Sequence, residues 1–148
     1  MSRYLVTCLS LIALSLSAPV SARDSALHLP IADVVAPTYA QGKLDGSVRF
    51  YFADQAAPAA ISRYGVGISN RKTNSVNKSD AEACRWAMLA ALIALQDQAK
   101  QRGANAVVAI TSYYKRVEFS SADEYECHAG TFTTGVALKG NYVKIAAD

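Results

Sequence analysis

Three side chains in this 148-residue sequence combine types and positions that could do chemistry: Cys84, Cys127 and His128. Two cysteines can form a disulfide, or they can join a histidine as ligands of a metal ion. A cysteine near the start of a helix can also become a reactive thiolate, provided that a histidine is available as its base. The surrounding sequence favours the disulfide.

The spacing around each cysteine predicts that both face a core. Cys84 belongs to a stripe at helical spacing, which consists of Cys84, Met88, Leu92, Leu95 and Ala99. Cys127 shares a strand face with Tyr125 and Ala129, and pairing with the strand that leaves the helix would place it under the helix start. A bridge would close a long loop and contribute roughly 4 kcal/mol.

The alternative is a metal-binding or thiol-reactive protein that uses Cys84, Cys127 and His128. Neighbouring residues on a strand point to opposite faces, which works against the convergence of Cys127 and His128. The sequence has no C-x-x-C or H-x-x-x-H spacing, and the other histidine, His28, lies near the N-terminus. We expect no catalytic residue, no metal site and no cofactor.

A phosphate-binding loop is suggested by "GVGISNRKT" at 65–73, which ends in Lys72 and Thr73. The match fails because Val66 and Arg71 stand where the Walker A motif requires glycine. The predicted helix also begins several residues after the threonine, so that its amides would not reach a phosphate. This stretch is interpreted as a solvated basic loop, and the protein is predicted not to be an enzyme.

The first 22 residues have the pattern of a secretory signal peptide. Arg3 precedes a short apolar run, and small residues lead to Ala22 before Arg23. Cys8 would be removed with this segment, and the apolar run is too short for a membrane helix. We expect a periplasmic or secreted protein without a membrane anchor. Removal of Arg3 lowers the formal net charge from +3 to +2, which is too small to indicate a nucleic-acid partner or an anionic membrane surface.

The rest of the chain is predicted to form one α+β domain over 47–148, preceded by a loosely structured segment over 23–46. Alternation and turn residues predict strands at 48–52, 61–69, 104–114, 125–140 and 142–145, and a polar loop at 70–78. A helix is predicted over 80–102, because Ser79 and Glu82 form a capping box and Gly103 provides a left-handed stop.

The predicted fold is a strand-helix-strand-strand core, with one long helix packed on a small mixed sheet and one disulfide. Residues 86–95 of the helix include no polar side chain. Such a helix must be covered on most sides, by a sheet, by the N-terminal segment or by another subunit.

The stretch "ALQDQAKQRGANAVVAI" at 94–110 resembles YbjQ-like domains and the related envelope-stress lipoprotein family typified by RcsF. The resemblance implies a strand-helix-strand-strand core in which a cysteine at the helix start is bridged to a later strand. RcsF-like proteins carry two bridges and a lipid anchor, whereas Cys84 and Cys127 allow one bridge here. YbjQ-like domains are associated with oligomers and loosely with heavy metals.

A longer resemblance joins "KLDGSVRFYF", "SNRKTNSVNKSDAEAC", "SYYK" and "GVALKG" to a group of small exported bacterial proteins of undefined role. Some members carry an "excinuclease ATPase subunit" label, which the failed Walker match and the signal peptide contradict. We expect a non-enzymatic binding or envelope-homeostasis module that contacts an unknown protein partner or a second copy of itself.

Overall fold

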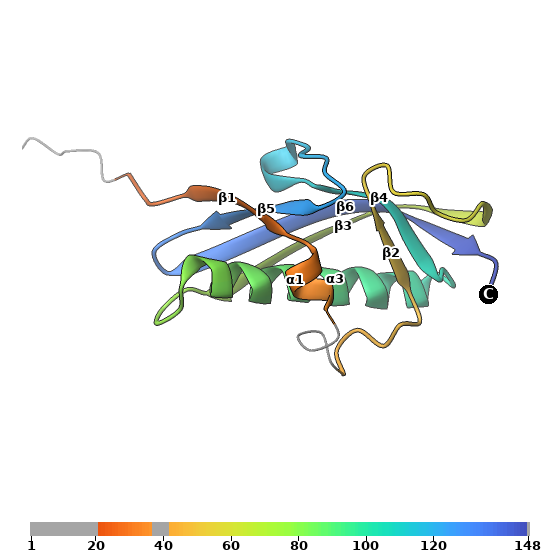
Figure 1. Ribbon diagram of the computed structural model, residues 1–148, viewed down its shortest axis with the longest axis horizontal. Helices are drawn as coiled ribbons and strands as arrows, with labels where there is room; N and C mark the ends of the chain where they lie inside the picture. Colours follow the sequence, from red (N-terminus) through yellow and green to blue (C-terminus); the bar gives the residue numbers. More distant parts are fainter. Residues whose placement is uncertain (1–20, 37–41, 148) are drawn as a thin grey trace, which may run out of the picture.

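The computed structural model describes residues 21–36 and 42–147. Its strands are β1 (Ser25–Pro30), β2 (Arg49–Phe52), β3 (Ala60–Asn74), β4 (Ala106–Ser112), β5 (Glu124–Ala129) and β6 (Thr133–Ile145). Its helices are α1 (Ala32–Val35), the long α3 (Asp80–Gln101) and the short 3-10 turn η1 (Tyr114–Arg116). α3 lies along one face of a curled sheet, here called the inner face, and η1 lies over the other, the outer face (Figure 1). This arrangement confirms the predicted α+β class, with one long helix on a mixed sheet.

β6 is the central strand of the sheet. One side of β6 pairs with β3, and the other side pairs with β4 and β5. β1 extends the sheet beyond β5, and β2 extends it beyond β4. The β2–β4 pair is parallel, whereas the other pairs are antiparallel.

Local capping signals define both ends of α3. The Ser79 hydroxyl accepts a hydrogen bond from the Glu82 backbone N–H at 3.1 Å, which satisfies one of the unpaired amides at the helix start. Gly103 follows the helix with φ +77°, a conformation that glycine adopts without steric cost. The predicted start is therefore confirmed, and the predicted end is right to within one residue.

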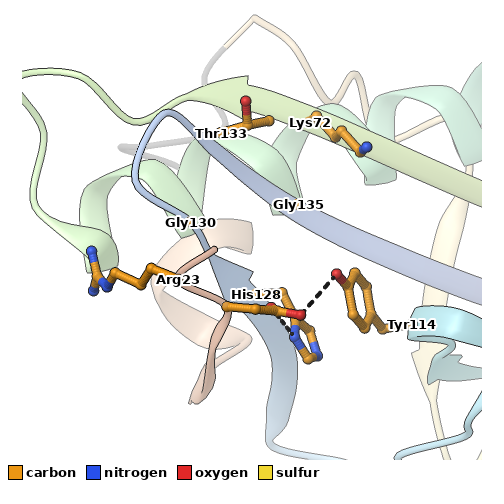
Figure 2. Close-up of a pocket in the computed structure, with 8 residues that line it drawn as sticks. Arg23, Lys72, Tyr114, His128, Gly130, Thr133 and Gly135 are labelled. Carbon is orange, nitrogen blue, oxygen red and sulfur yellow. Dashed lines mark hydrogen bonds and ion pairs between the residues drawn. The ribbon is translucent and has the colours of Figure 1, made fainter. Parts of the chain in front are cut away.

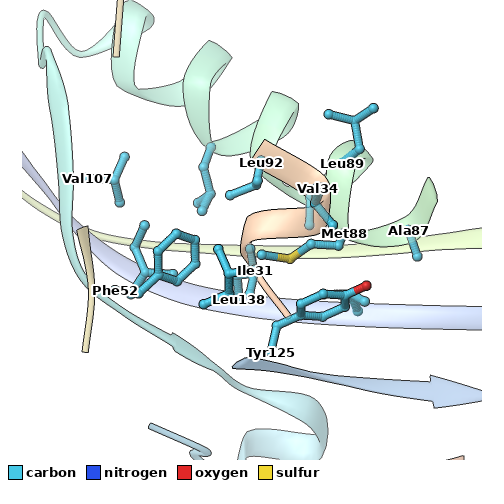
Figure 3. Packing of buried hydrophobic residues seen from close by; sticks show 14 of the residues in the cluster. Ile31, Val34, Phe52, Ala87, Met88, Leu89, Leu92, Val107, Tyr125 and Leu138 are labelled. Carbon is cyan, nitrogen blue, oxygen red and sulfur yellow. The ribbon is translucent and has the colours of Figure 1, made fainter. Parts of the chain in front are cut away.

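The apolar run of α3 is covered from two sides. Figure 3 shows Met88 and Leu92 packed between the sheet and the N-terminal segment that carries Ile31 and Val34. Trp86 is the most exposed residue of the run 86–95, at 39%. The sequence predicts that a sheet, the N-terminal segment or another subunit covers this helix. In the described structure the sheet and the N-terminal segment do so.

The prediction that 23–46 is loosely structured is wrong for β1 and α1. β1 pairs with β5 along its whole length, from Ser25 opposite Ala129 to Pro30 opposite Glu124. This ladder satisfies the backbone groups on the side of β1 that faces β5, although the side chains of β1 are only half-buried or exposed. The partner strand lies about a hundred residues away, so that no local pattern reveals it.

Two other predicted boundaries are also wrong. The loop expected at 70–78 begins only after Asn74, because β6 continues to pair with β3 up to Thr133. The strands expected at 125–140 and 142–145 are instead β5 and β6, which are joined by a tight turn. Gly130 opens this turn, where its N–H donates to the Thr133 carbonyl at 3.0 Å.

Replacing Gly67 by alanine is expected to destabilise the fold. A Cβ at position 67 would overlap the buried ring of Tyr142, whose hydroxyl donates to Gln98 of α3 at 2.6 Å. Overpacking of this kind costs about 1–3 kcal/mol of unfolding free energy, which urea denaturation measures. Ser69→Ala is the matched control, since the buried Ser69 hydroxyl has no partner in the described structure. An unchanged midpoint for Gly67→Ala would contradict this packing.

Candidate functional site

The two cysteines predicted to pair form a disulfide. Cys84 lies in the second turn of α3 and Cys127 in the middle of β5, with their Cα atoms 5.8 Å apart. Both side chains are completely buried. The bond joins the beginning of the helix to a strand near one edge of the sheet. The pairing partners of that strand are β1 and β6, rather than the strand that leaves the helix.

His128 lies on the face of β5 opposite to Cys127. Its Nδ1 is 2.8 Å from an oxygen of Asp24, and its Nε2 is 3.0 Å from an oxygen of Glu126. Because both sulfurs are used in the disulfide and His128 points to the outer face, Cys84, Cys127 and His128 do not form one site. Within residues 21–36 and 42–147, no three cysteine, histidine or acidic side chains are arranged to hold a metal.

The outer face instead carries a chain of polar contacts, here called the histidine network, which consists of Asp24, His128, Glu126 and His28. Glu126 connects the two histidines, since its other oxygen is 3.4 Å from His28 Nε2. Aromatic rings stack on both imidazoles, with Tyr114 on His128 at 3.5 Å between centroids and Phe119 on His28 at 4.1 Å. The network joins β1 to β5 and holds η1 above the sheet.

Asp24 is the most strongly engaged carboxylate of this network. The hydrogen bond from His128 holds the pKa of Asp24 below its usual value of 3.8, partial desolvation opposes this, and Lys115 at 3.2 Å lowers the pKa further. The Tyr114 hydroxyl donates to the same carboxylate at 3.3 Å (Figure 2). Both nitrogens of His128 face carboxylates, so that the imidazole acts as a cross-link between strands.

A hollow of about 190 Å³ adjoins this network (Figure 2). Its lining comes from four segments of the outer face and comprises Arg23, Asp24, Lys72, Tyr114, His128, Gly130, Thr133 and Gly135. Arg23 is already ion-paired with Asp80 at the start of α3. Among the polar groups around this hollow, Asp24 is engaged with His128 and Tyr114, which connects the residue before β1 to β5 and to η1.

A different part of the outer face exposes apolar groups. β3 pairs with β6 and with no other strand of the described chain, so that its second edge is free. Val66 and Ile68 on β3 are 51% and 53% exposed, and Ile61 is 68% exposed. A hollow of about 320 Å³ lies beside Val66, and its rim includes the Lys139–Glu118 ion pair. We refer to Val66, Ile68 and the free edge of β3 as the β3 surface.

Sequence reasoning found the disulfide but neither the histidine network nor the β3 surface. The histidine network depends on the unpredicted register between β1 and β5. The exposure of Val66 and Ile68 depends on which face α3 covers, and the sequence of 61–69 predicts a strand without indicating which of its faces meets the helix. Only the alternation itself was available as a signal.

Comparisons with known proteins leave the family open. No protein-family model matches the chain, and no curated protein matches it significantly. In the part of the chain that the structure describes, no helix combines the length and the apolarity needed to cross a membrane.

Breaking the disulfide is expected to lower the unfolding free energy by roughly 4 kcal/mol, because the unfolded chain regains the freedom of a long loop. Urea denaturation of the oxidised protein and of the Cys84→Ala/Cys127→Ala variant measures this difference. The same denaturation after reduction is the control, since reduction should weaken the wild type and leave the variant unchanged. Equal midpoints for the oxidised wild type and the variant would contradict a stabilising bond.

The depressed pKa of Asp24 predicts an acid-dependent contribution to stability. A carboxylate with a folded pKa below its unfolded value of 3.8 stabilises the fold above that value, and the effect is lost as the pH falls through the folded pKa. The difference in melting temperature between wild type and Asp24→Asn should therefore be constant above pH 4 to 5 and shrink towards pH 2. Asp97→Asn, at an exposed position of α3, is the control. A difference that does not change with pH would refute the assignment.

Proposed function

We propose that the protein is a non-enzymatic binding module that works outside the cytoplasm, in the periplasm or after secretion. The predicted signal peptide supports export. The buried Cys84–Cys127 disulfide is consistent with an oxidising compartment, where such bonds form and persist. In this proposal the module contributes to envelope homeostasis by contacting another polypeptide.

The observation that carries the proposal is the exposure of Val66 and Ile68 on one strand. Both are large apolar side chains that alternate with the buried Gly67 and Ser69, so that they lie on the same outer face. Neighbouring exposed apolar groups with a polar rim are typical of protein interaction sites. The Lys139–Glu118 pair supplies polar groups beside them.

The resemblance to YbjQ-like and RcsF-like domains supports the same proposal. YbjQ-like domains are associated with oligomers, and the RcsF-like family consists of envelope-stress lipoproteins. These associations favour protein contacts and an envelope location over catalysis.

Photo-cross-linking tests this function at the β3 surface. A photoreactive amino acid at position 68, in cells that export the protein, is expected to yield a discrete cross-linked product with another polypeptide. The same amino acid at position 97, an exposed site on α3, is the matched control and should yield no such product. Absence of a product from position 68, or the same products from both positions, would contradict the proposal.

A further inference from the structure

The hydrogen-bonding pattern of β6 shows which backbone groups of β3 are free. The Tyr113 N–H donates to the Ala137 carbonyl at 2.8 Å, so that the polar groups of Ala137 point away from β3. In an antiparallel ladder the residue opposite then also points its N–H and C=O away, and that residue is Asn70. Alternate residues behave alike, which places the backbone groups of Ile68, Asn70 and Lys72 along the free edge.

Two side-chain contacts agree with this assignment. The Asn70 carbonyl accepts a hydrogen bond from Arg71 Nη1 at 3.1 Å, and the Asn74 carbonyl accepts one from Lys78 Nζ at 3.1 Å. Neither carbonyl would be accessible to these side chains if it faced β6. The edge from position 68 to position 74 therefore presents a row of donors and acceptors that a further strand could pair with.

The charges of β3 restrict which strand could pair there. β3 carries Arg63, Arg71 and Lys72 and no acidic residue, and Lys78 follows it. A second copy of β3 would add three more cations and no carboxylate to the strand pair, so it offers these cations no charge complement. Cations on an edge discourage indiscriminate pairing, and an acidic strand is the one that they attract.

We propose that the free edge of β3 takes up an extended acidic segment of a partner polypeptide as an additional strand. Main-chain hydrogen bonds to Ile68, Asn70 and Lys72 supply the pairing. Apolar side chains of the segment cover Val66 and Ile68 on the outer face, and carboxylates on the opposite face of the segment meet Arg71. This inference rests on the proposed function, since it names the partner class of the same surface.

Two designed peptides test the charge requirement. One is a fluorescein-labelled eight-residue peptide that alternates valine and glutamate, and the other replaces each glutamate by lysine. Fluorescence anisotropy at low salt should show at least tenfold tighter binding of the glutamate peptide, and this binding should weaken in 0.5 M NaCl because salt screens the exposed charges. The variant Arg71→Glu/Lys72→Glu should reverse the preference and bind the lysine peptide.

Substitutions at Asn70 test the strand pairing itself. Asn70→Pro removes an N–H that points away from β6, so that the β3–β6 ladder stays intact while the edge loses a donor. It should weaken binding of the glutamate peptide at least tenfold, whereas Asn70→Ala, which keeps the N–H, should change it less than twofold. Circular dichroism checks that both variants are folded. If Asn70→Pro is not folded, the preference of the charge-reversal variant Arg71→Glu/Lys72→Glu for one of the two peptides still tests the inference.

Several outcomes would overturn the inference: no binding of either peptide, equal binding of both, or equal binding by the proline and alanine variants. A dimer that Asn70→Pro dissociates would show that a second copy occupies the edge instead. A cross-link from position 68 that survives Asn70→Pro would retain the proposed function and remove this inference. Binding of the glutamate peptide without any cross-link in cells would uphold the edge and contradict the function.

Discussion

The covalent bond between Cys84 and Cys127 determines how the helix layer meets the sheet. It attaches the beginning of α3 to β5 in the interior, at a point where both side chains are excluded from solvent. Because successive residues of a strand alternate between faces, a buried Cys127 places Glu126 and His128 on the outer face. The histidine network and the position of η1 follow from that orientation. The bond fixes against α3 the same face of β5 on which Tyr125 and Ala129 are buried.

β6 connects β5, to which the disulfide is attached, with β3 and β4. It pairs with three strands, and side chains on both of its faces are buried over much of its length. Close packing on its inner face depends on small residues, since Gly67 leaves room for the ring of Tyr142 and Gly140 for Val107. The Tyr142 hydroxyl in turn contacts Gln98 of α3. The outer face of β3, by contrast, receives no cover from any described element, which explains why Val66 and Ile68 are exposed.

Features with local causes could be predicted from the sequence, and features with distant causes could not. Ser79 and Gly103 predict the ends of α3, and the stripe through Cys84 predicts its inner face. The pairing of β1 with β5 and the extension of β3 to Asn74 depend on partners far along the chain. The same distinction holds for the sites. Cysteine chemistry and the predicted signal peptide favour a disulfide, whereas the contacts of Asp24 with His128 and the free edge of β3 require the strand register.

The position of Trp86 gives the protein an intrinsic optical probe. It is the sole tryptophan of the chain, lies two residues from Cys84 and has the ammonium group of Lys43 5.7 Å from its ring centroid. Lys43 belongs to the N-terminal segment, and the Lys43 carbonyl accepts a hydrogen bond from the side chain of Gln96 on α3. Detachment of that segment would leave the indole more hydrated and shift its emission to longer wavelength. The fluorescence of Trp86 thus reports whether the N-terminal segment is packed on α3. It does so separately from changes on the outer face of the sheet.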